Sequence, residues 1–70
     1  MAIPSKIVDI KEGWATVRSD KHNHRANLSL VKDVKVGDYV LVHGDMVLNK
    51  VEKEEAEKIL KMVNNNYYEK

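Results

Sequence analysis

Short apolar runs separated by turn residues fill the first fifty positions, and this spacing constrains the fold more than any other feature of the sequence. The strongest run covers residues 39–43, YVLVH, and its dense apolar and β-branched content predicts a strand buried on both faces or nearly so. Segments with turn composition flank it at residues 36–38 (VGD) and 44–45 (GD). Short strands with frequent turns are typical of small all-β domains.

Four more runs complete the expected sheet, at residues 3–10, 14–18, 24–28 and 46–51. Alternation in the second of these predicts that Ala15 and Val17 share one face, opposite Trp14 and Arg18. Before that strand, Gly13 can adopt the positive φ of a hairpin turn. Residues 29–35 lack a period of two, so we expect an irregular connection there, with room for one helical turn.

The hydrophobic period changes after Glu52. Ala56, Ile59, Leu60 and Val63 follow at helical spacing, with Lys and Glu between them. We expect a helix over about 53–63 that packs one stripe on the sheet and is ended by the asparagines at 64–66, before a tail at 64–70 without a function. Residues 1–70 therefore form one mainly β domain, a small OB-like five-stranded β-barrel (about 1–51) with a C-terminal α-helix.

Composition limits the functions open to the chain. With 12 Lys and Arg against 11 Asp and Glu, the net charge is +1, so binding must depend on a local surface. The absence of cysteine excludes disulfides and thiolate zinc sites, and together with the lack of a signal-peptide pattern it favours a cytoplasmic location. No stretch approaches transmembrane length, and no nucleophile or phosphate-binding motif indicates an enzyme.

The three histidines allow two interpretations, a metal site or residues without a metal-binding role. His22 and His24 are separated by one residue, and a metal site would require His43 to converge with them from another strand. Two imidazoles without an evident third ligand bind a divalent ion only weakly, so the interpretation of His22 and His24 as solvated turn residues is favoured. His43 ends the most apolar strand, so it can lie half-buried at the rim of the barrel. A histidine in that position is as consistent with a structural role as with a functional one.

Basic residues offer an alternative function in nucleic-acid binding. Lys6, Arg18, Lys21 and Arg25 can form a basic edge near Trp14, and OB-type modules often bind single-stranded nucleic acid. One Trp, three Tyr and no Phe, however, leave few stacking platforms. Nucleic acid is therefore not the partner that we expect first.

Three segments together resemble the HypC/HupF family of small chaperones in nickel–iron hydrogenase maturation. They are AIPSKIV at residues 2–8, VKVGDYVLVH at residues 34–43 and EEA at residues 54–56. The second segment is the most specific, because it joins a turn, a strand and a terminal histidine in the order that the family uses. The proline-stiffened apolar start is also poorly explained by solubility alone.

This resemblance implies an OB-like barrel with a C-terminal helix, acting as an accessory chaperone without enzymatic activity or a membrane partner. Its expected partners are the hydrogenase large-subunit precursor and the maturation protein HypD, during assembly and delivery of the Fe(CN)2CO centre. The partner-binding residues predicted in this way are Met1, Ala2, Ile3, Pro4, Ser5, Lys6 and His43.

The first residues depart from the family's pattern. Family members begin Met-Cys-Leu-Ala-Ile-Pro or close to it, and the resemblance implies that this cysteine engages the iron and the partners, whereas this chain reads MAIP. Two explanations stay open: the sequence begins two residues late, or this member acts by protein contact alone. A thiolate is a far better iron ligand than a thioether or an α-amino group, so we expect no bound cofactor or metal in the chain as written.

Overall fold

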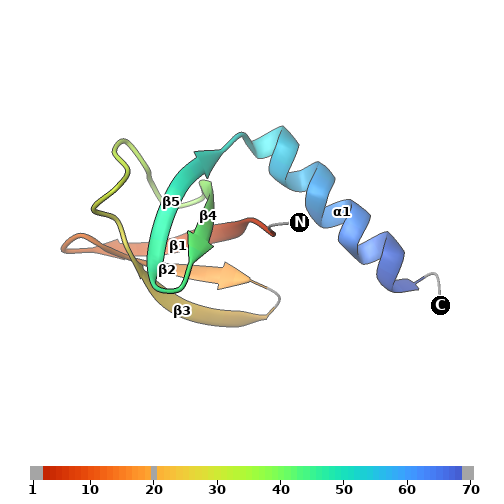
Figure 1. Ribbon diagram of the computed structural model, residues 1–70, viewed down its shortest axis with the longest axis horizontal. Helices are drawn as coiled ribbons and strands as arrows, with labels where there is room; N and C mark the ends of the chain where they lie inside the picture. Colours follow the sequence, from red (N-terminus) through yellow and green to blue (C-terminus); the bar gives the residue numbers. More distant parts are fainter. Residues whose placement is uncertain (1–2, 20, 69–70) are drawn as a thin grey trace.

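The computed structural model, which describes residues 3–19 and 21–68, contains five strands followed by one helix (Figure 1). The strands close a barrel in the order β1-β2-β3-β5-β4, which confirms the predicted fold class. Their bounds are β1 (Ser5–Lys11), β2 (Trp14–Ser19), β3 (His22–Asn27), β4 (Tyr39–His43) and β5 (Met46–Val51), and the helix is α1 (Lys53–Tyr68).

Two tight hairpin turns lie where the sequence predicts them. Glu12 and Gly13 connect β1 to β2 with φ values of +52° and +81°, while Lys11 pairs with Trp14. Two successive positive φ values define a turn whose twist matches that of the flanking strands. Gly44, with φ of +63°, opens the turn between β4 and β5.

A β-bulge at Val8 divides β1 into two halves. Ile7 lies opposite Val17 on β2, but the next pair joins Asp9 to Thr16, so Val8 is the extra residue. Ile7 faces the core before the bulge and Ile10 faces it after the bulge, so both side chains pack in the core. Val8 itself is 38% exposed.

The barrel core consists of small and β-branched side chains. Its fully buried members are Ile7, Ala15, Val17, Ala26, Val40 and Val47. Burial of Ala15 and Val17 confirms the alternation predicted for β2. The expectation that β4 is buried on both faces or nearly so is confirmed only in part, because Val40 is buried, the other apolar residues of the strand are half-buried and His43 is exposed. The interior of a small barrel covers one face of each strand and leaves the other near solvent.

Residues 28–38 form the irregular connection that the sequence predicts, and no helical turn occurs along this described segment. Its last part is bonded to β1. The amide of Ile7 donates to the Asp38 carbonyl at 2.8 Å, and the amide of Gly37 donates to the Ile7 carbonyl at 2.8 Å. Gly37 adopts a φ of +100°, a backbone conformation that residues other than glycine rarely adopt. These bonds fix where β4 begins relative to β1.

Helix α1 is longer than predicted and packs over less of its length. It continues to Tyr68, because an asparagine costs less than about 1 kcal/mol of helix propensity and the segment lacks Gly and Pro. Ala56 is fully buried, Ile59, Leu60 and Val63 are half-buried, and Met62 is 50% exposed. Figure 1 shows α1 leaving the barrel and extending away from it, which agrees with overall dimensions of 42 × 21 × 18 Å. The predicted packing stripe is therefore confirmed mainly at the start of the helix.

Candidate functional site

The chain start lies beside β4, the strand that carries His43. Ser5 pairs with Val40 and Lys6 pairs with Tyr39 in an antiparallel ladder. Because the two strands are antiparallel, the N-terminal end of β1 points in the same direction as the end of β4 that carries His43. The described pairing ends at Ser5.

Burial divides the predicted partner-binding residues into two groups. Ile3 is 45% exposed and Lys6 is exposed, with its Nζ 5.9 Å from the centre of the Tyr39 ring. Pro4 is fully buried and Ser5 is only 4% exposed. These two residues therefore anchor the segment and position their exposed neighbours. Met1 and Ala2 lie outside the described residues.

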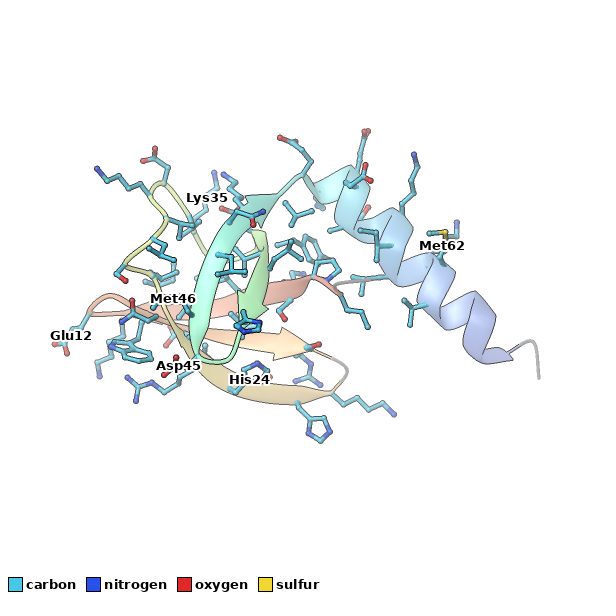
Figure 2. All side chains as sticks on the ribbon, in the orientation of Figure 1. Glu12, His24, Lys35, Asp45, Met46 and Met62 are labelled. Carbon is cyan, nitrogen blue, oxygen red and sulfur yellow. The ribbon has the colours of Figure 1, made fainter. Side chains whose placement is uncertain are left out.

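His43 lies at the end of β4, where it pairs with Met46 across the hairpin turn. Its side chain is exposed, in contrast to the half-buried position considered from the sequence. Figure 2 labels Asp45 and Met46, which mark this turn at the edge of the barrel. An exposed imidazole in this place is accessible to a partner and is free to donate or accept a hydrogen bond.

The histidines do not assemble into a metal site. His22 and His24 are both exposed on β3, and His24 pairs with Val17. Within residues 3–19 and 21–68, no three side chains of His, Cys, Asp or Glu come together as a ligand group. The hypothesis of a site shared by His22, His24 and His43 is therefore wrong.

Within residues 3–19 and 21–68, no helix is long and apolar enough to cross a membrane.

Asp38 is an organising residue that the sequence reasoning did not single out. Its Oδ2 accepts a hydrogen bond from the Lys35 amide at 2.9 Å and lies 3.4 Å from the Nζ of Lys50 on β5. The hydrogen bond from Lys35 is the main cause that lowers the pKa of Asp38, and the charge of Lys50 adds to it, while partial burial acts in the opposite direction. The Gly-Asp pair at the end of a predicted turn is the signal that could have identified it.

Comparisons with known proteins place the chain in a family. The model of the HupF/HypC family matches residues 1–63. Hydrogenase maturation factor HypC from Rhizobium leguminosarum bv. viciae is 38% identical over 64 residues, which cover 90% of this chain and 85% of that protein. The proteins of the same name from Helicobacter hepaticus and Cupriavidus necator are 38% and 33% identical, over 74% and 70% of their own lengths. The match to the family model over most of the chain and these three relatives show that the chain belongs to the HupF/HypC family.

Proposed function

We propose that this chain is an accessory chaperone of nickel–iron hydrogenase maturation that binds the large-subunit precursor and the maturation protein HypD. The observation that carries the proposal is the family match over residues 1–63, which includes the whole predicted partner-binding segment and His43. The names of the relatives point to the same process. A cytoplasmic location, where these partners would be met, is part of the proposal.

Ile3, Lys6 and His43 form the surface that we assign to partner binding. Ile3 keeps 45% of its surface exposed although the next residue, Pro4, is fully buried. An exposed apolar side chain together with a cation and an imidazole suits a protein interface, which combines an apolar centre with polar groups around it. Met1 and Ala2, which precede Ile3 in the sequence, belong to the same proposed partner-binding segment.

The iron centre with its cyanide and carbon monoxide ligands is the cargo of the proposed process. Direct binding of such iron calls for a soft ligand such as a thiolate, and the sequence contains no cysteine. The described residues hold no group of three ligating side chains. We therefore assign contacts with protein partners to the chain as printed, and no step of iron binding.

Co-purification tests the proposal. The chain carries a C-terminal affinity tag, so that the N-terminal edge stays free, and is produced together with a hydrogenase large-subunit precursor and HypD. We expect the tagged chain to retain both partners, and the double variant K6A/H43A to retain much less of each. The matched control is K21A/H22A, which removes the same residue types from exposed positions near the β2–β3 turn.

The control variant must behave like the unaltered chain. Equal losses in the two double variants would show that the effect comes from charge or folding and not from the assigned surface. If the unaltered chain retains neither the precursor nor HypD, the proposed function itself is wrong.

A further inference from the structure

Cations gather on the outer face of the sheet formed by β1, β2 and β3. Lys6 lies directly opposite Arg18, and Lys11 lies opposite Trp14, while Arg25 is on the adjoining strand β3. These side chains alternate along their strands with the buried core residues, so they point outward. We call Lys6, Lys11, Trp14, Arg18 and Arg25 the cationic face.

The four cations of this face outnumber the two carboxylates nearby, those of Asp9 and Glu12. Among the described residues, the ion pair within 4.0 Å joins Lys50 to Asp38, and none involves a cation of this face. Like charges at directly opposite positions on adjacent strands repel, and Lys6 and Arg18 occupy such a pair. Their charged ends contact other neighbours, the Tyr39 ring on β4 for Lys6 and the Asn23 side chain on β3 for Arg18. An anionic partner would relieve this repulsion.

An open hollow of about 370 Å³ lies on the same face. It is lined by Asp9, Lys11, Glu12, Trp14, Thr16 and Arg25. The guanidinium of Arg25 lies over the half-buried Trp14 ring, 4.9 Å from its centre. The hollow therefore offers an aromatic ring, cations and two carboxylate acceptors within one site.

We propose that the cationic face docks an extended acidic segment of a partner protein. Carboxylates of that segment pair with Lys6, Lys11, Arg18 and Arg25, and its amide donors meet the carboxylates of Asp9 and Glu12. Charge complementarity carries this assignment, because four exposed cations on one face form no ion pair with a carboxylate among the described residues. The inference does not depend on the proposed function.

A polypeptide fits this face better than a nucleic acid. Trp14 and Tyr39, the aromatic residues of this region, each have a cation over the ring, at 4.9 Å and 5.9 Å from the ring centres. A base would have to displace these cations in order to stack. A peptide can also donate its backbone amides to the carboxylates of Asp9 and Glu12, whereas a phosphate backbone offers them no hydrogen-bond donor.

Trp14 is the only tryptophan in the chain, so its fluorescence reports on the hollow. The probes are a capped ten-residue peptide of alternating Glu and Gly, its Lys-Gly counterpart and a ten-nucleotide oligothymidylate, each titrated into the full chain at low salt. The test variant is K11Q/R18Q, which leaves the contact between Arg25 and Trp14 in place. The control is K58Q/K61Q on α1, which removes two exposed cations away from the hollow, since Figure 2 shows Glu12, which lines the hollow, and Met62 at opposite ends of the molecule.

We expect a saturable change in Trp14 fluorescence with the Glu-Gly peptide. Affinity should fall about five- to tenfold in K11Q/R18Q, since two solvent-exposed ion pairs of modest strength are lost, and less than about twofold in K58Q/K61Q. The proposal is overturned by the absence of a saturable change with this peptide, by equal weakening in both variants, or by equal binding of the Lys-Gly peptide. Tighter binding of oligothymidylate would overturn it in favour of a nucleic-acid surface.

Discussion

The Asp38 carboxylate lies 3.4 Å from the Lys50 ammonium and joins the end of the irregular connection to β5. The backbone of the same residue accepts a hydrogen bond from Ile7 on β1. One residue therefore connects three segments that are distant in sequence. Since β4 begins at the next residue, this junction also sets the register that brings the chain start alongside β4.

Replacing Asp38 by Asn should destabilise the fold by about 1 kcal/mol, because it removes the charge that strengthens the hydrogen bond from Lys35 and the pair with Lys50. Urea unfolding monitored by circular dichroism measures the change. Asp45→Asn is the matched control, since Asp45 is exposed, and it should stay within about 0.5 kcal/mol of the unaltered chain. Equal effects of the two substitutions would contradict a special role of Asp38.

The contribution of Asp38 to stability should also depend on pH. Its pKa in the folded chain is lowered from the ordinary value of 3.8, so the unfolded chain takes up the proton first as the pH falls. The stabilisation is therefore complete above about pH 5 and is lost as the pH falls through the folded-state pKa. The difference between the unaltered chain and Asp38→Asn should be constant from pH 7 to pH 5 and should shrink below pH 4. A difference that grows in acid would refute this assignment.

Glu12→Asn should stabilise the chain by about 0.5–1 kcal/mol, because Asn tolerates the left-handed conformation better than Glu and Asn-Gly is the preferred pair for such a turn. Glu12 has a φ of +52° and precedes Gly13 at +81°. Gly13→Ala tests the same turn in the other direction. An added Cβ would meet nothing within 4 Å, so a loss of about 1 kcal/mol there would come from the backbone alone. Thermal unfolding distinguishes these outcomes, and a destabilising Glu12→Asn would contradict the turn geometry.

Much of this architecture could be predicted from local patterns. Alternation placed Ala15 and Val17 in the core, and the turn signals at Gly13 and Gly44 correctly separated the strands. The bulge at Val8 could not be predicted, because it is defined by the register between β1 and β2 and not by either strand alone. Asparagine content likewise failed to predict the end of α1, because helix propensity is a weak bias that neighbouring residues can override.

Prediction of the candidate site was more limited. The family resemblance predicts partner-binding residues that include Ile3, Lys6 and His43, whereas the burial of Pro4 and Ser5 depends on packing that no local pattern encodes. The proximity of basic residues to Trp14 was anticipated, and the contact with Arg25 confirms part of it. The direct opposition of Lys6 and Arg18, in contrast, required the register between strands.

Docking of the helix should depend on Ala56, the fully buried residue among the described side chains of α1. Ala56→Gln should destabilise the fold by about 1–3 kcal/mol, because a larger polar side chain is forced into a packed contact. Glutamine is a good helix former, so a loss measures packing and not helicity. Glu57→Gln, at the next and exposed position, should change the free energy of unfolding by less than about 0.5 kcal/mol. Similar values for both variants would show that α1 is not anchored at this point.

Ile3 provides the sharpest test of the assigned partner-binding surface, because Val8 offers a matched control close to it in the sequence. The two apolar side chains are 45% and 38% exposed, so Asp at either position should leave the fold largely intact. We expect Ile3→Asp to weaken capture of the large-subunit precursor or HypD about tenfold, equivalent to about 1.4 kcal/mol, since it places a charge at the apolar part of the interface. Val8→Asp should change capture less than about twofold. Titration of purified partners against both variants measures the affinities, and thermal unfolding verifies that both variants are folded. Equal binding by Ile3→Asp and the unaltered chain would place the interface elsewhere on the barrel.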